Sequence, residues 1–274
     1  MMTPQKDQEL DEKEMLEMLR FQVEAGADEC ILDEPRSSFE AEQGARAVVS
    51  AADQSDKTSV SDAKPAVSDL PIPAFPLPQT SKGFEAAESL DALKKACAAF
   101  DGCDLKKTAT NMVFADGNPE AKVMLIGEAP GADEDRQGKP FVGVSGQLLD
   151  RMLSSIGLDR EQVYITNILL WRPPGNRTPT TEEIALFLPI IRRHIQLVAP
   201  RVLVTLGGSA SKALLGSSTG ILKLRGKWHP FDDGTGREIP LLPTLHPAYL
   251  LRTPGQKALS WHDLRLLHRQ LAAP

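Results

Sequence analysis

Short apolar runs alternate with amphipathic stretches along the later part of the chain. The runs have the length and apolar content of buried strands, and they lie at 121–127, 162–170, 201–207 and 239–247. The intervening stretches have apolar residues at helical spacing, and they lie at 146–158, 178–198, 209–216 and 259–271. Strands that alternate with helices form parallel sheets covered on both faces. The pattern therefore predicts a three-layer α/β/α fold with a central, four-stranded, mainly parallel sheet.

The N-terminal part of the chain lacks this alternation. Residues 1–34 are acidic and contain the apolar spacing of one short amphipathic helix, over 11–25. Residues 35–83 consist mainly of Ala, Ser, Asp and Pro, which cannot bury enough apolar surface to offset the entropy of ordering. We therefore expect a largely disordered N-terminal extension, made of an acidic segment and a linker, before a folded domain at 84–274.

The net charge of −6 is unevenly divided along the chain. Residues 1–85 carry 8 Lys and Arg against 18 Asp and Glu, whereas the remaining 189 residues carry 23 against 19. Such asymmetry is typical of an acidic extension beside a domain that can meet a polyanion. The acidic segment is expected either to bind a protein partner or to act as a solubilising tail.

Composition excludes several classes of protein. Three cysteines, Cys30, Cys97 and Cys103, do not make a disulfide framework in a chain of 274 residues. No apolar run is long enough for a transmembrane helix, and the acidic N-terminus does not resemble a secretory signal. The sequence predicts a reduced, cytoplasmic protein without a membrane partner, and a monomer is expected.

Polar motifs follow each of the four predicted strands. They read GEAPGADEDRQGKPFVG at 127–143, TNILLWRPPGNR at 166–177, LGG at 206–208 and LHPAYLLR at 245–252. Ligands of open parallel sheets bind beyond the carboxyl ends of the strands. The motifs are therefore expected to converge on one site at that edge of the sheet.

Four of these sequences resemble the motifs of one enzyme family. GEAPGADEDRQGKPFVG, YITNI, RPPGNRTPT and HPAYLLR, in this order and spacing over roughly 93–271, are similar to the motifs of type-four uracil-DNA glycosylases. The resemblance implies a uracil-DNA glycosylase-like fold at 84–274. It implies a repair enzyme that flips uracil out of DNA and hydrolyses its N-glycosidic bond, leaving an abasic site. Its partner would be uracil-containing DNA.

Three side chains carry base recognition in this interpretation. Phe141 corresponds to the family's phenylalanine on which the flipped uracil stacks. Asn167 offers a primary amide that can donate to uracil O4 and accept from N3–H, a pattern that cytosine reverses. His246, which ends the fourth strand run, is placed to donate to uracil O2 as negative charge develops there. Structural roles, in the core for Phe141 and as a hydrogen-bonded histidine for His246, are the alternatives.

The first motif also supplies acids and backbone groups. A solvated charge run is the simplest interpretation of its acids, which are Glu128, Asp133, Glu134 and Asp135. In the family, acids of this loop are associated with the water nucleophile, the cationic sugar and exclusion of the thymine methyl, which favours Glu128 and Glu134 as catalytic residues. The remaining expected substrate contacts are Gly127, Ala129 and Gly131, with Gly143 as a further flexible position, and Asn176 in the second motif.

The resemblance also implies an iron–sulfur cluster that this sequence does not support. The family holds four iron and four sulfur atoms with four cysteines, whose positions here are occupied by Phe100, Cys103, Trp171 and Phe187. Cys97 lies near the first position but cannot replace the other losses, because such clusters need four ligands. We therefore predict that the cluster is lost, that no metal or cofactor is bound, and that aromatic rings fill the space.

Three other functions remain open from the sequence. The domain could bind DNA or a repair partner without catalysis, although intact Phe141, Asn167 and His246 argue against that. It could be a nucleotide-binding enzyme on a similar sheet, but LGGSASKALLG lacks the spacing of a phosphate-binding loop. It could also excise other deaminated bases, such as hypoxanthine or xanthine.

Overall fold

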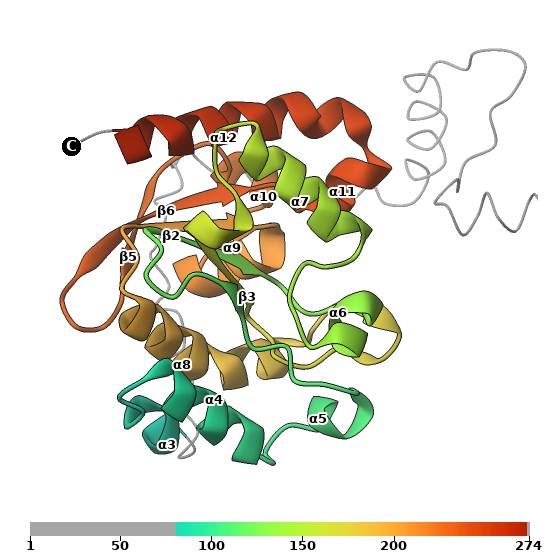
Figure 1. Ribbon diagram of the computed structural model, residues 1–274, viewed down its shortest axis with the longest axis vertical. Coiled ribbons are helices and arrows are strands. Elements are labelled where there is room, and N and C mark those ends of the chain that lie inside the picture. Colours follow the sequence, from blue (N-terminus) through green and yellow to red (C-terminus); the bar gives the residue numbers. More distant parts are fainter. Residues whose placement is uncertain (1–80, 273–274) are drawn as a thin grey trace, which may run out of the picture. The chain divides into compact units, whose positions relative to one another are not determined.

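The computed structural model describes residues 81–272 (Figure 1). The predicted amphipathic helix at 11–25 and nearly all of the predicted linker lie outside these residues. The described chain begins with α3 (Ser81–Glu85), in which Phe84 is buried against the ring of Phe100. The described part of the domain therefore starts at Ser81, three residues before the predicted boundary at 84.

A six-stranded sheet forms the centre of the domain, in the order β1-β3-β2-β4-β6-β5. Its four inner strands are parallel, and they are β2 (Val123–Gly127), β3 (Val163–Asn167), β4 (Val202–Leu206) and β6 (Glu238–Thr244). These confirm the four predicted strands. The edge strands β1 (Asp116–Gly117) and β5 (His229–Asp232) are antiparallel to their neighbours and were not predicted. Neither has an apolar run, since one is two residues long and the other contains proline.

Helices cover both faces of the sheet, which confirms the three-layer prediction (Figure 1). One face packs against α4 (Leu90–Ala99), α8 (Thr181–Val198) and α9 (Gly208–Leu215). The other packs against α7 (Val144–Ser154), α11 (Pro247–Arg252) and α12 (Lys257–Ala272). Alternate residues of β2 serve the two cores, since Met124 and Ile126 point to the first and Val123 and Leu125 to the second.

Short helical segments complete the domain and shape the loops. They are α5 (Leu105–Thr108), α6 (Ala132–Gln137), α10 (Ile221–Leu224), and the 3-10 turns η1 (Arg160–Gln162), η2 (Pro174–Asn176) and η3 (Pro254–Gln256). The acidic part of the first motif, expected as a loop, is thus the helix α6. Helix α6 and the turn η2 both lie at the carboxyl edge of the parallel strands, where they contribute walls to a pocket.

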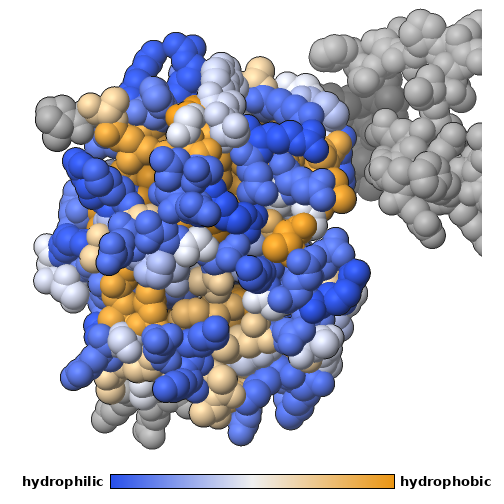
Figure 2. Space-filling view, viewed as in Figure 1, coloured by the Kyte–Doolittle hydropathy of each residue, from blue (hydrophilic) through white to orange (hydrophobic). Residues whose placement is uncertain are grey.

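The surface of the domain is mainly polar on the face shown in Figure 2, where apolar side chains form separate patches between hydrophilic ones. Large apolar side chains with notable exposure include Val144, Leu222 and Trp261. Within residues 81–272, none of the helices combines the length and the apolar character needed to span a bilayer.

Candidate active site

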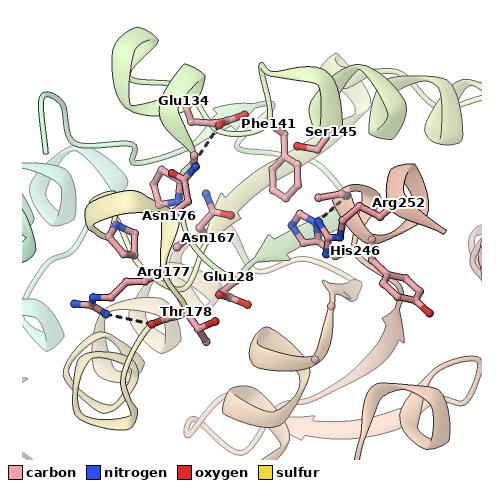
Figure 3. Close-up of a pocket in the computed structure, with 18 residues that line it drawn as sticks. Glu128, Glu134, Phe141, Ser145, Asn167, Asn176, Arg177, Thr178, His246 and Arg252 are labelled. Atoms are coloured by element: carbon pink, nitrogen blue, oxygen red, sulfur yellow. Dashed lines mark hydrogen bonds between the residues drawn. The ribbon is translucent and has the colours of Figure 1, made fainter. Parts of the chain in front are cut away.

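A pocket of about 460 Å³ opens at the carboxyl ends of the four parallel strands. Glu128 follows β2, Asn167 ends β3, Gly207 follows β4 and His246 follows β6, and all four residues line this pocket. Gly127, a predicted substrate contact, ends β2 but does not line it. The strand-end motifs therefore meet in one place, as their positions predicted. Figure 3 shows Glu128, Phe141, Asn167 and His246 arranged around the same space.

The amide of Asn167 lies at the base of the pocket beside Gly127, its partner across β2 and β3. A Cβ atom on Gly127 would lie 2.3 Å from Asn167 Oδ1 and 2.6 Å from the ring of Phe141. Glycine is thus required for these two side chains to approach the strand end. Asn167 is 2% exposed, and its Oδ1 has no hydrogen-bond partner among the described residues. A buried oxygen without a partner is costly, so a ligand that supplies a donor would be favoured here.

Phe141 forms a wall of the pocket beside the end of β2. Its side chain is buried, and its ring centre lies 5.6 Å from that of His246, with the two planes tilted by 32°. Its backbone has a φ of 54°, in the left-handed region that non-glycine residues rarely adopt. The ring of Phe141 therefore gives the pocket a flat apolar surface. Because its backbone conformation is unfavourable, surrounding contacts must stabilise it.

His246 is held as a neutral imidazole. It caps α11, and its Nδ1 accepts a hydrogen bond of 3.1 Å from the backbone N–H of Ala248. Burial is the main cause that lowers the pKa of His246 to about 4, with a further contribution from the positive charge of Arg252. The proton of the neutral ring therefore sits on Nε2, which is free to donate into the pocket.

The acids of the first motif divide into different roles, so their interpretation as a solvated charge run was wrong for two of them. Glu134 is buried, and its carboxylate accepts from the backbone N–H groups of Gly131 at 3.1 Å, Val142 at 3.0 Å and Gly143 at 2.9 Å. Asp135 is also buried and accepts from two backbone N–H groups after α5. Sequence spacing could not reveal these backbone partners.

The other two acids of the motif are more accessible. Glu128 is half-buried and lines the pocket, and its carboxylate forms no hydrogen bond with the rest of residues 81–272. Asp133 pairs with Arg136 one turn later on α6, at 2.6 Å. Glu128 is therefore the carboxylate of this motif that remains available to a ligand.

Comparisons with known proteins agree with this arrangement. The family model of the uracil DNA glycosylase superfamily matches residues 114–265. A type-4 uracil-DNA glycosylase of Archaeoglobus fulgidus is 42% identical over 61% of this chain and 85% of its own length. Another, of Sulfurisphaera tokodaii, is 38% identical over 68% of this chain and 86% of its own. The chain belongs to the type-4 uracil-DNA glycosylases. A type-5 uracil-DNA glycosylase of Thermus thermophilus covers less of the chain, 45%, at 34% identity.

The pocket contains further residues that sequence reasoning did not single out. Ser145, Arg177, Thr178, Tyr249 and Arg252 also line it. Two of them belong to the HPAYLLR motif, in which the histidine alone drew attention. The predicted contacts Ala129, Gly131 and Asn176 line the pocket as well. Asn176 has a left-handed backbone, and its Oδ1 accepts from Arg172 Nε at 2.7 Å, so the oxygen of this amide is already engaged.

The four positions at which the resemblance places cluster ligands lie in or against one apolar core, and none of them lines the pocket. Trp171 and Phe187 are buried, with ring centres 5.7 Å apart and planes at 63°. Phe100 packs against the same core, to which the buried Cys97 and Cys103 also belong. We call Phe100, Cys103, Trp171 and Phe187 the aromatic corner.

The aromatic corner does not have the ligands that a cluster needs. In the described part of the chain, no group of three or more His, Cys, Asp or Glu side chains could hold a metal ion. Burial raises the pKa of Cys97 to about 12, and it is also the main cause that raises the pKa of Cys103. These two cysteines are fewer than the four ligands that such a cluster needs. The residues present therefore do not fit an iron–sulfur cluster.

Proposed function

We propose that this protein excises uracil from DNA by hydrolysing the N-glycosidic bond, leaving an abasic site. Its type-4 relatives carry that activity in their names, and the chain covers most of their length. The observation that carries the proposal is the buried Asn167 Oδ1, which lacks a partner within residues 81–272 and lies, like the Phe141 ring, beside Gly127 at the end of β2. A flipped uracil would supply the missing donor.

Recognition of the base is assigned to Asn167 and Phe141. The Asn167 Oδ1 would accept from uracil N3–H, and the amide NH2 would donate to O4. Cytosine has an unprotonated N3 and an amino group at those positions. Its N3, an acceptor, would face the acceptor Oδ1, and its amino group, a donor, would face the NH2 donor of Asn167. Stacking on the ring of Phe141 would fix the plane of the base and tolerate any pyrimidine. Selectivity would therefore come from the amide rather than from the ring.

Stabilisation of the leaving group is assigned to His246. Negative charge develops on uracil O2 as the glycosidic bond breaks, and a preorganised donor there lowers the barrier. The neutral ring has its Nδ1 engaged by Ala248 and its Nε2–H free. Because burial keeps the imidazole neutral, this donor needs no change of protonation near neutral pH.

The carboxylates are given different roles. We assign the attacking water and the cationic sugar to Glu128, because its carboxylate faces the pocket without another hydrogen bond inside the described region. Glu134, the second predicted catalytic acid, has both oxygens occupied by backbone N–H groups. We therefore assign Glu134 to holding the loop that carries Phe141.

We further propose that excision needs neither a metal nor an iron–sulfur cluster and that one chain forms the complete active unit. No step of the proposed reaction involves the aromatic corner. All the residues that are assigned to the reaction come from a single chain. The acidic residues 1–34 are proposed to bind a partner outside this chemistry. Other deaminated bases are a second candidate substrate class, limited to bases that present a carbonyl beside an N–H to Asn167.

Release of free base from oligonucleotides tests the proposal. The parent is expected to release uracil from a uracil-containing strand and to leave a matched thymine or cytosine strand intact. His246→Ala should slow uracil release by about 10²-fold or more, the scale of losing a transition-state donor. His262→Ala, at an exposed histidine of α12, is the matched control and should match the parent. DNA binding without release of any base from a panel of uracil, hypoxanthine and xanthine would favour the non-catalytic alternative.

A further inference from the structure

The backbone of Phe141 needs support from outside the pocket. Its φ of 54° is in the left-handed region, although the residue carries a bulky side chain. Phe141 can leave the left-handed region only if the two peptide groups that flank it reorient, and this would move the ring. One of them is the peptide between Phe141 and Val142. Gly146 lies directly behind this peptide, and a Cβ atom there would lie 1.8 Å from the Phe141 carbonyl oxygen. The peptide is therefore closely packed on one side.

The guanidinium of Arg160 donates hydrogen bonds to the backbone carbonyls of Pro140 and Phe141. One nitrogen, Nη1, donates to the carbonyl of Pro140 at 3.1 Å, and Nη2 donates to the carbonyl of Phe141. Arg160 stands in η1, just before β3, and the reacting base would not touch it because it does not line the pocket. A planar fork with five donors suits two adjacent carbonyls, whereas a lysine could reach them only as a point charge.

Two carboxylates hold the guanidinium in turn. Asp116 of the edge strand β1 accepts from Arg160 Nη1 at 2.7 Å, and Asp150 of α7 accepts from Arg160 Nε at 3.2 Å. The side chains of Arg160 and Asp116 are 24% and 21% exposed, so the pair is partly shielded from water. The short, otherwise unremarkable strand β1 thus supplies the anchor for this contact.

The N–H side of the Phe141–Val142 peptide is held by the negatively charged carboxylate of Glu134. The N–H of Val142, which belongs to the peptide that contains the Phe141 carbonyl, donates to Glu134 at 3.0 Å. Arg160 therefore holds the oxygen of this peptide and Glu134 holds its hydrogen. Rotation of the peptide would break both charge-assisted contacts together.

We propose that Arg160 is a positioning residue for base excision, which sets the left-handed backbone of Phe141 and thereby the plane in which the ring meets the flipped base. The proposal rests on the proposed uracil excision for its kinetic consequence. It assigns a function to a residue that lies outside every motif and that acts through Phe141.

The kinetic test is a double-mutant cycle under single-turnover conditions. Arg160→Gln should slow uracil excision by about tenfold or more, the scale of losing charge-assisted hydrogen bonds. Arg160→Lys should recover little of this loss. In a Phe141→Ala background, Arg160→Gln should have no further effect on excision, while its effect on thermal stability persists. Equal slowing in both backgrounds, or no slowing in the parent, would overturn the proposal.

Arg237→Gln is the matched control, because Arg237 also pairs with a carboxylate, Asp233, and donates to a backbone carbonyl, that of Pro200. It should reduce stability without slowing excision by the folded protein.

A crystal structure of the full-length Arg160→Gln protein decides the matter even if the parent excises no uracil. Phe141 leaving the left-handed region supports the positioning role, and an unchanged Phe141 backbone refutes it.

Discussion

The pocket and the aromatic corner stand in contrast within one domain. In the pocket, polar atoms face open space, and the Asn167 Oδ1 is buried without a partner in the described region. In the corner, three of the four family cysteine positions hold aromatic residues, and Trp171 packs edge-on against Phe187. A site that reads a base depends on particular donors and acceptors, so its residues cannot be exchanged freely. A site that only holds a loop in place needs stabilising contacts of any kind, and close packing of apolar side chains can supply them.

One stretch of chain joins the two regions. After β3, Leu169, Leu170 and Trp171 are buried in the core, and the chain then forms the pocket wall at Pro173 and Asn176. Anchoring of Trp171 therefore determines where this wall begins. The corner is thus expected to affect the pocket through position and stability rather than through chemistry.

The largest expected effect comes from opening the aromatic corner. Trp171→Ala should lower the free energy of unfolding by about 3–5 kcal/mol, because a large buried ring leaves a cavity. Trp261→Ala, at a tryptophan 45% exposed on α12, is the matched control and should change it by about 0.5 kcal/mol or less. Urea unfolding of both variants measures this. Comparable losses in the two would contradict the assignment of Trp171 as a structural anchor.

A smaller effect is expected from reversing the hydrogen-bond pattern in the pocket. Asn167→Asp removes the donor to O4 and should cost about 1–3 kcal/mol in activation free energy for uracil, or about tenfold or more in rate. Slight excision of cytosine should appear, because a carboxylate suits its amino group. Single-turnover excision from matched uracil and cytosine strands measures both.

His246→Ala separates recognition from catalysis in the same assay. It should slow excision without changing the choice of base, since O2 is common to the two pyrimidines. If Asn167→Asp excises uracil at the parent rate, Asn167 is an ordinary strand residue and the pocket assignment fails.

A pH-dependent effect should arise from two buried histidines, one in the pocket and one in the core beneath α8. Burial lowers the pKa of His246 to about 4 and that of His194, on the α8 side of the core, to about 3. As the pH falls below 6.5, the ordinary pKa of histidine, these side chains become protonated in the unfolded chain but stay neutral in the folded one. The free energy of unfolding therefore falls. Each histidine should cost about 1.5 kcal/mol between about pH 6.5 and pH 5.

Urea unfolding across this pH range measures the slope. His194→Phe should remove about half of the histidine contribution to it. A variant that keeps the full slope of the parent would show that His194 is protonated in the folded protein.

The parts of the fold that could be predicted are those with a dense apolar pattern. Strands β2, β3 and β4 are buried throughout and β6 is buried over most of its length, and their apolar runs identified all of them. The edge strands β1 and β5 carry no such pattern, because an edge needs few apolar residues. Buried acids were also missed, since the carboxylate of Glu134 is satisfied by backbone N–H groups that no side-chain pattern reveals.

The candidate site shows the same limit. Asn167 and His246 lie at or next to the ends of predicted strands, and the family resemblance of the first motif led to Phe141. Arg160 could not be found in this way, since it contacts Phe141 across 19 positions of sequence and belongs to no motif. Contacts of this kind depend on how loops pack, which local sequence does not specify.

The most direct test measures iron and uracil excision on one preparation of the full-length protein, isolated without oxygen. The account predicts a colourless protein with far less than one iron atom per chain and single-turnover excision of uracil that a chelator does not reduce. About four iron atoms per chain, with visible absorption and loss of excision on their removal, would contradict it.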